Sequence, residues 1–362
     1  MAGSSHGLEK RMDIGKLPIN LLAKLLSKVT LDERVVVGPG IGVDAAVIDY
    51  GERLLVAKTD PITFATDLIG WYAVNINAND IAVMGADPKW FMATILLPRK
   101  TSPAQAEGLF DQMLRACGEL EISLVGGHTE ITHDLNRPVI VGCMLGETDR
   151  SRLVTAGGAK PGDDIFITKG IAIEGTCILA REAGDRLMGL GFTKRFLKRA
   201  ANFLFDPGVS VVRDARVATD AAWVTAMHDP TEGGLATGLM EIAEASGLGL
   251  EVLLEDIPVL PETQALCREL KLDPLGLIAS GCLVLTASPS DTPRLLEAFA
   301  REGIRACTIG KMMPREHGLK MRTPQGLQDL PAFPRDEIAR FFRAGGQWLR
   351  SAASSFMARN YL

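Results

Sequence analysis

The sequence predicts a two-domain α/β protein. Strand-like and helical patterns alternate through the first half, and the alternation resumes after the turn-rich run Ala156-Gly-Gly-Ala-Lys-Pro-Gly162. The 362 residues, 47% of them hydrophobic and 23% charged, are enough for two domains that each bury a core. We therefore predict a flexible leader over 1–12, domains over 13–155 and 156–325, and a helical extension over 326–362.

Charge and cysteine content narrow the function classes. A net charge of −5 gives no basic surface for nucleic acid, and no apolar run reaches the roughly 18 residues that a membrane span needs. The six cysteines form no C-x-x-C pair, which indicates free thiols in a reducing compartment. We expect a cytoplasmic protein with neither nucleic acid nor membrane as partner.

In the first half, a strand over 53–59 is expected to deliver Asp60 at its end, because Pro61 is unfavourable inside a strand. A helix over 69–84 follows, with Gly85 as its stop. Ser102-Pro103-Ala104-Gln105 is a capping box that opens a helix ending near Gly118. The remaining strands are expected over 90–97, 121–125 and 138–145.

The second half repeats this style. Strands are expected over 164–168, 223–227, 249–254, 281–287 and 305–310. Helices are expected over 175–187, 208–221, 233–246 and 291–302. The stretch 335–360 predicts one or two amphipathic helices whose aromatic side chains need a surface to cover: Phe341, Phe342, Trp348 and Phe356.

The helix over 69–84 carries four polar residues among its apolar positions: Asn75, Asn77, Asn79 and Asp80. Asn and Asp are poor helix formers because their side chains compete for the backbone, so their clustering needs a reason. One interpretation is a solvated face. The other is a ligand site.

Four aspartates stand beside Gly, Ala, Thr or Pro at expected strand ends or helix starts: Asp44, Asp60, Asp80 and Asp229. They could converge only around cations, because like charges raise each other's pKa values. Oxygen ligands of this kind suit Mg²⁺, which often completes its shell with phosphates. After Asp229, Pro230-Thr-Glu-Gly-Gly234 opens a helix whose free amides favour phosphate. Each aspartate alone is also consistent with an ordinary turn or cap.

Gly126-Gly127-His128-Thr129-Glu130 follows an expected strand and is typical of a phosphate-binding turn. A zinc site at His128, Glu130 and His133 lacks further ligands at a suitable spacing. The sequence contains no Walker A motif and no protein-kinase D-F-G. The glycines at 38, 40 and 42 precede a strand, which disfavours a dinucleotide fingerprint.

An ordered set of motifs resembles the superfamily of aminoimidazole ribonucleotide synthetase, thiamine monophosphate kinase, selenophosphate synthetase and the hydrogenase maturation protein HypE. The matching elements are Val43-Asp44-Ala45-Ala46-Val47, Thr59-Asp60, Asn79-Asp80 through Pro88, Gly126-Gly127-His-Thr129, Lys160-Pro161-Gly162-Asp163 and Asp229-Pro-Thr-Glu-Gly233-Gly234-Leu. They span about residues 35–325.

The resemblance implies a PurM-like fold, with an N-terminal domain that pairs in a homodimer to form a β-barrel and a C-terminal α/β sandwich domain. It implies ATP cleavage with Mg²⁺ held by Asp44, Asp60, Asp80 and Asp229. The residues implied near the nucleotide are Thr59, Asn79, Gly126, Gly127, Thr129 and Thr231. The residues implied in catalysis on a small-molecule substrate are His128, Glu130 and Asp80.

Among the members, HypE is the most similar, which allows a maturation partner protein. The chain departs from HypE in lacking a terminal cysteine and in having Ser280-Gly281 where HypE has Glu-Gly. It departs from thiamine monophosphate kinase at Val43 and His128, and residues 1–42 lack the cysteine of selenophosphate synthetase. The expected function is an ATP-dependent enzyme that acts on an oxygen of a small molecule. The alternatives are a HypE-type role, a kinase or an inactive nucleotide-binding scaffold.

Overall fold

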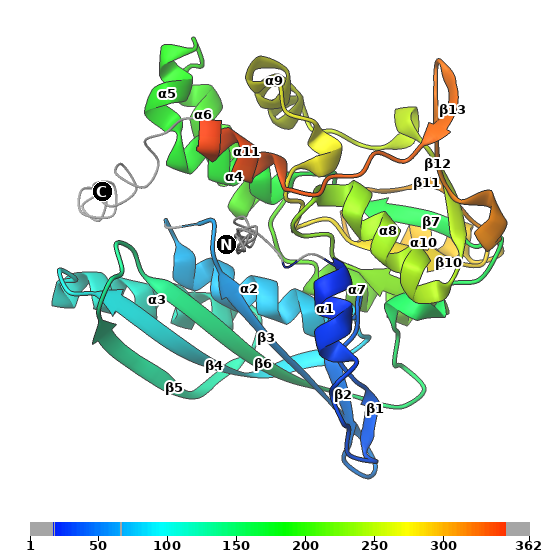
Figure 1. Ribbon diagram of the computed structural model, residues 1–362, viewed down its shortest axis with the longest axis horizontal. Coiled ribbons are helices and arrows are strands. Elements are labelled where there is room, and N and C mark those ends of the chain that lie inside the picture. Colours follow the sequence, from blue (N-terminus) through cyan, green and yellow to red (C-terminus); the bar gives the residue numbers. More distant parts are fainter. Residues whose placement is uncertain (1–16, 18, 66, 345–362) are drawn as a thin grey trace, which may run out of the picture.

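The computed structural model describes residue 17 and residues 19–65 and 67–344, and it contains two sheets, one in each half of the chain (Figure 1). The predicted two-domain α/β architecture is confirmed. The described part of the single chain contains no closed barrel, so the barrel remains a prediction about a dimer. The leader over 1–12, Trp348 and Phe356 lie outside the described residues. No described helix is long and apolar enough to cross a membrane.

The first sheet has six strands, and all neighbouring pairs are antiparallel except β4 and β5. Its order is β1 (Val35–Val37), β2 (Ala46–Asp49), β3 (Leu54–Ile62), β6 (Val139–Thr148), β4 (Asp87–Pro98) and β5 (Ser123–Thr132). The expectation that Pro61 ends its strand is wrong, because β3 continues to Ile62. β2 pairs only with Leu54–Ala57, so at Pro61 the strand has β6 as its one neighbour and tolerates a missing N–H.

The predicted turn at Gly126 and Gly127 is also wrong, because both residues lie inside β5. The pairing of β5 with β4 shifts register after Phe91, which marks a bulge. Gly127 has φ +147° there, and a Cβ would lie 2.1 Å from the Ala93 carbonyl oxygen. Gly127 is therefore explained by a close approach of the neighbouring strand, whereas a Cβ at Gly126 would make only an ordinary contact, 3.9 Å from the Met92 side chain.

The second sheet has seven strands, all antiparallel to their neighbours except β12 and β9. Its order is β13 (Gly326–Asp329), β12 (Leu319–Thr323), β9 (Gly249–Leu253), β11 (Ala306–Met313), β7 (Asp164–Thr168), β10 (Val284–Ala287) and β8 (Val224–His228). The strand predicted over 164–168 is confirmed. β7, β8 and β10 are buried along their whole length, which explains their continuous apolar character.

The central helix of the first domain is α2 (Ile69–Ala82), and every one of its residues is buried. A solvated polar face is therefore excluded. Asn75 and Asn77 donate to the carbonyls of Trp71 and Ala73, at 2.9 and 2.8 Å. Gly142 makes room for Asn77, because a Cβ at Gly142 would lie 2.3 Å from the Asn77 amide nitrogen. The amide nitrogens of both side chains thus donate to backbone carbonyls of their own helix, whereas Oδ1 of Asn77 has no partner among the described residues.

The other helices surround the two sheets. They are α1 (Ile19–Leu26), α3 (Pro103–Glu119), α4 (Ile173–Glu182), α5 (Gly184–Gly189), α6 (Lys194–Ala201), α7 (Val212–Ala221), α8 (Gly234–Ser246), α9 (Pro261–Leu270), α10 (Thr292–Arg301) and α11 (Glu337–Ala344). The capping box of α3 is confirmed in both hydrogen bonds. The helix predicted over 175–187 is two helices, and α1, α6 and α9 were not predicted. All six cysteines are free.

The C-terminal helix α11 confirms the amphipathic prediction over its described part. Phe341 is buried, and the Arg186 guanidinium of α5 lies 4.3 Å from the centre of its ring. Asp336, just before the helix, accepts a hydrogen bond from the Gly233 amide at 2.7 Å. Helix α11 therefore packs against α5 of the second domain, and the residue before it contacts the glycine-rich loop after Asp229.

Candidate functional site

Three of the four predicted aspartates, Asp44, Asp80 and Asp229, form a buried cluster where the two domains meet. Asp44 precedes β2, Asp80 lies on α2, and Asp229 follows β8 in the second domain. Their exposed fractions are 6%, 4% and 1%. Carboxylate oxygens of Asp44 and Asp229 lie within 4.8 Å of each other. This arrangement is consistent with the prediction that the aspartates converge on one site.

Lys58 supplies one positive charge inside the cluster. Its Nζ lies 3.1 Å from Oδ1 of Asp80. Burial disfavours the ammonium, but Asp80, Asp60 and Asp44 more than offset that cost and raise the pKa of Lys58. Burial raises the pKa of Asp80 to about 7, against the opposing effect of Lys58. Lys58 therefore stays charged, whereas Asp80 titrates near neutrality.

His228 links the two domains at the other side of the cluster. Its Nδ1 lies 2.6 Å from Oδ1 of Asp44, and its Nε2 lies 2.9 Å from Oε2 of Glu241 on α8. Burial disfavours the imidazolium, but Asp44 and Glu241 outweigh burial and raise the pKa of His228 well above its ordinary value. The imidazole ring is thus fixed at both nitrogens.

Several carboxylate oxygens in the cluster have no hydrogen-bond partner among the described residues. They are Oδ1 and Oδ2 of Asp229, Oδ2 of Asp44 and Oδ2 of Asp80. Burial, followed by the charges of Asp80 and Asp44, raises the pKa of Asp229 well above its ordinary value. Buried carboxylates are normally paired or bound to a metal. The donor set therefore fits a divalent cation.

Three other residues of the first domain that were predicted to hold metal or nucleotide differ in their burial and in their hydrogen bonds. Asp60 is half-buried on β3, two residues beyond Lys58. Thr59 is exposed, and its hydroxyl donates to the Gly142 carbonyl at 2.8 Å. Asn79 donates to the Val209 carbonyl at 2.9 Å and accepts from the Val211 amide at 2.8 Å, so it joins α2 to the second domain. Its role at a nucleotide stays a prediction.

Thr231 is half-buried in the loop between β8 and α8. Its carbonyl accepts from the amides of Gly234 and Ala279, at 3.1 and 3.3 Å. Gly233 has φ +83° and Gly234 has φ +65°, conformations that only glycine adopts readily. The two glycines of this loop are therefore explained by its backbone, which leads from Asp229 into α8 at Gly234.

Within one chain the structure does not bring the β5 residues to the cluster. Gly126, Gly127, His128, Thr129 and Glu130 are all exposed. His128 Nε2 lies 3.2 Å from Glu130 Oε2, so these two side chains contact each other. β5 is three strand positions from β3, which is roughly 14 Å at the usual spacing. The catalytic roles predicted for His128 and Glu130 therefore need a second chain.

A further buried carboxyl group, Glu174, was not predicted. It lies in the first turn of α4 and is 5% exposed, and its Oε2 has no hydrogen-bond partner among the described residues. Burial raises the pKa of Glu174 to about 8, and Asp336, Glu232 and Asp60 add to the shift. This carboxyl extends the acidic character of the region between the domains.

The site also includes three residues to which no sequence motif assigned a role: Lys58, His228 and Glu241. Lys58 and His228 stand next to predicted motif residues, and their proximity to Asp60 and Asp229 was the available signal. The contact between Asp44 and His228 joins residues 184 positions apart, and local pattern does not reveal such a contact. Glu241 carries no signal, because a glutamate on a helix is usually a solvated residue.

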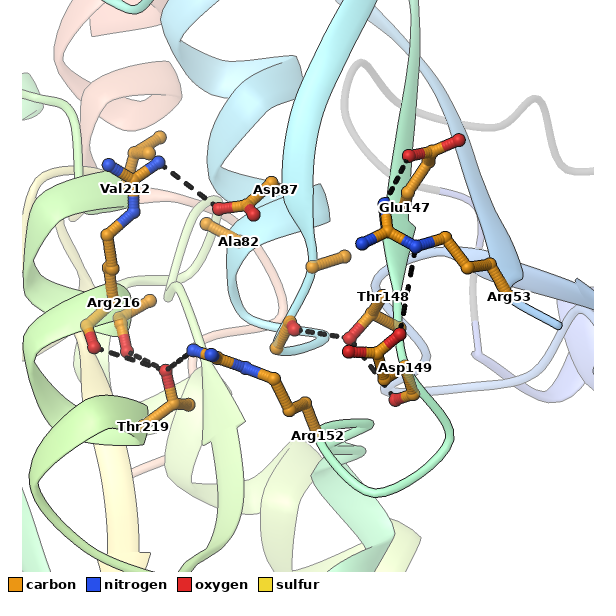
Figure 2. A pocket seen from close by; sticks show the side chains of 13 residues that line it. Arg53, Ala82, Asp87, Glu147, Thr148, Asp149, Arg152, Val212, Arg216 and Thr219 are labelled. Atoms are coloured by element: carbon orange, nitrogen blue, oxygen red, sulfur yellow. Dashed lines mark hydrogen bonds and ion pairs between the residues drawn. The ribbon is translucent and has the colours of Figure 1, made fainter.

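A separate pocket of about 130 Å³ lies between the C-terminal ends of α2 and β6 in the first domain and helix α7 in the second (Figure 2). Arg216 pairs with Asp87 at 3.1 Å, and Arg53 pairs with Glu147 at 2.6 Å. Arg152 pairs with Asp220 at 2.6 Å. Because each of these guanidinium groups already has a carboxylate partner, this pocket is a domain contact lined with ion pairs and is not the acidic cluster.

Comparisons with known proteins agree with this arrangement. Residues 42–148 match the family model of the AIR synthase related protein N-terminal domain, and residues 160–320 match that of its C-terminal domain. Over 291 residues the chain is 30% identical to the carbamoyl dehydratase HypE of Cupriavidus necator, covering 78% of this chain and 80% of the relative.

Two solved structures have the same fold. A crystal structure of HypE in complex with ATP matches with a TM-score of 0.67 and 24% identity, covering 89% of this chain and 92% of that one. A chain of a crystal structure of a HypE–HypF complex matches with a TM-score of 0.70 and 21% identity, covering 86% of this chain and 99% of that one. At this identity the likeness establishes the fold alone.

Proposed function

The chain belongs to the family of AIR synthase related proteins, and we propose that it is an ATP-using enzyme that phosphorylates or activates an oxygen of a small molecule. The observation that carries the proposal is the buried group of Asp44, Asp80 and Asp229, whose four unpartnered oxygens fit a divalent cation. The ATP in the similar HypE structure supports the nucleotide.

In the proposed mechanism, Asp44, Asp60, Asp80 and Asp229 would hold Mg²⁺, which would supply positive charge to neutralise the phosphate oxygens of ATP. Lys58 keeps a fixed positive charge beside Asp80 and reduces the repulsion among the carboxylates. The amides of the loop before α8 lie directly after Asp229 and offer donors to phosphate. Catalysis would then consist mainly of positioning and charge neutralisation.

Calorimetric titration with a nonhydrolysable ATP analogue, with and without Mg²⁺, tests this proposal. We expect Mg²⁺-dependent binding that Asp80→Asn and Asp229→Asn each abolish while the chain stays folded. Asp220→Asn is the matched control, because Asp220 is an exposed aspartate paired with Arg152. Failure of the unaltered protein to bind the analogue under either condition would overturn the proposal.

A homodimer is part of the proposed function. Along β6, Val141, Cys143 and Leu145 are half-buried, whereas the alternate residues are buried. β5 is an edge strand with exposed apolar side chains at Val125 and Ile131. These features favour the pairing of two first domains into the barrel that the family resemblance implies. Such pairing would allow the β5 residues of one protomer to serve a site of the other.

The acceptor substrate and the catalytic group are tested by a metabolite-stimulated ATPase screen. We propose that His128 and Glu130 act on the transferred phosphoryl group or its acceptor. A metabolite that raises ADP formation in the unaltered protein should do so less in His128→Ala and Glu130→Gln. Equal stimulation in all three proteins would make both residues bystanders.

Formation of ADP separates two alternative enzymes from a third alternative, an inactive scaffold. A HypE-type dehydratase or a kinase would form ADP with its acceptor, and the HypE relative of Cupriavidus necator favours the first. An inactive nucleotide-binding scaffold would bind the analogue and form no ADP with any acceptor. Lys58 favours the scaffold alternative, because it already neutralises part of the acidic cluster.

A further inference from the structure

We propose that Asp44, His228 and Asp229 form a mixed nitrogen and oxygen site that binds a first-row transition-metal dication in preference to Mg²⁺. This inference deepens the proposed function, since Asp44 and Asp229 belong to the proposed Mg²⁺ group. It assigns to His228 the role of a ligand, and to Glu241 the role of positioning that ligand.

The geometry of the three residues suits an ion. One ligand atom of each lies within 4.8 Å of the others, and all three residues are buried. Ligand atoms about 2.1 Å from an ion are at most roughly 4.2 Å apart, so the side chains are near the required spacing. Both carboxylate oxygens of Asp229 and Oδ2 of Asp44 have no hydrogen-bond partner among the described residues.

The surroundings of His228 point to the same role. A histidine that ligates a metal usually donates its other N–H to a carboxylate, which fixes the ring. Here Nε2 lies 2.9 Å from Glu241, and Nδ1, which contacts Asp44 at 2.6 Å in the metal-free chain, would exchange its proton and that hydrogen bond for the ion. The histidine side chain is 7% exposed and that of Glu241 is 14% exposed, so the pair has a defined orientation.

The ligand chemistry determines the class of ion. Mg²⁺ takes oxygen ligands almost exclusively, whereas imidazole suits first-row transition metals. One imidazole with two carboxylates therefore favours Mn²⁺, Fe²⁺, Co²⁺ or Zn²⁺. Asp60 and Asp80, which lie beside Lys58, would then hold the Mg²⁺ that arrives with a nucleotide, together with the second carboxylate oxygens of Asp44 and Asp229.

The test uses Mn²⁺ with the full chain and no nucleotide. We expect one tightly bound Mn²⁺ per chain, with ¹⁴N coupling in pulsed electron paramagnetic resonance spectra. His228→Gln should abolish the coupling and weaken binding more than about tenfold. Glu241→Gln should weaken binding by roughly 10- to 100-fold and keep the coupling. His317→Gln is the matched control, because His317 is another histidine paired with a carboxylate, 3.0 Å from Glu251.

The inference is overturned if bound Mn²⁺ in the unaltered protein shows no ¹⁴N coupling, or if His228→Gln keeps the coupling and the affinity. The unaltered spectrum and Glu241→Gln decide the question even where His228→Gln does not fold. Nucleotide binding with Mg²⁺ but no nitrogen-coordinated Mn²⁺ would refute this inference alone. Nitrogen-coordinated Mn²⁺ without nucleotide binding would support the site and refute the proposed function.

Discussion

At the scale of single residues, the carboxyl of Glu174 should make stability depend on pH independently of the metal site. Burial raises its folded-state pKa to about 8 from an ordinary 4.5. Between these pH values the folded chain holds a proton that the unfolded chain has released, so stability falls as pH rises through this window. The full stability contribution is present below the unfolded pKa.

Glu174→Gln keeps the shape of the side chain and removes this titration. We expect the variant to gain stability over the unaltered protein as pH rises from about 4.5 to 8, reaching at most a few kcal/mol, and the difference to level off above that range. Chemical denaturation at a series of pH values measures it. Parallel profiles for the two proteins would show that Glu174 is ionised in the folded chain.

Residue patterns predicted the aspartates of the site but not their charge partners. Asp44, Asp80 and Asp229 stand out because each is an acidic residue beside small or turn-forming residues. Lys58 and His228 acquire their roles only through contacts across elements, at separations of 22 and 184 residues. Local sequence therefore indicates which carboxylates matter, whereas the fold determines how their charge is balanced.

At the scale of elements, the segment before α11 supports the loop that follows Asp229. Asp336 accepts hydrogen bonds from the Gly233 and Ile338 amides, at 2.7 and 2.8 Å. Its neighbour Glu337 accepts instead from the Asp273 amide at 2.9 Å. One side chain thus touches the proposed phosphate loop, and the other attaches the same segment elsewhere.

We expect Asp336→Ala and Glu337→Ala each to destabilise the protein by about 1–3 kcal/mol, because each leaves buried backbone donors without an acceptor. Only Asp336→Ala should also weaken binding of the ATP analogue, by about tenfold, since the loop then loses an anchor. Thermal denaturation and calorimetry separate the two effects. Equal losses of nucleotide affinity would mean that the segment acts only through overall stability.

The ends of an element were predicted correctly where a local sequence motif marks them. The capping box gives the start of α3, and the apolar run of β7 gives both of its ends. The errors at Pro61 and at Gly126-Gly127 arose because the neighbouring strands decide whether a proline or glycine is tolerated. Such information is tertiary, and a single segment does not contain it.

At the scale of the whole molecule, the site joins the two domains through contacts of long sequence separation. Asn79 bonds to residues 130 and 132 positions later, and Asp44 bonds to His228. The sequence predicted two α/β domains from alternating patterns and a turn-rich connection. It could not place Asp44 against the second domain, because that geometry depends on how both cores pack.

Assembly of the molecule should depend on the edge strand β5. Ile131 on this strand is 60% exposed, and Val125 is 53% exposed. A free edge with apolar side chains favours pairing with another chain.

We expect light scattering to show a dimer at micromolar concentration. Ile131→Glu should weaken dimerisation more than tenfold, because it places a charge in the interface. Trp223→Glu, at a residue 66% exposed in the second domain, is the control and should leave the dimer intact. A monomeric unaltered protein, or equal effects of both substitutions, would contradict pairing through β5 and would leave His128 and Glu130 far from the acidic cluster.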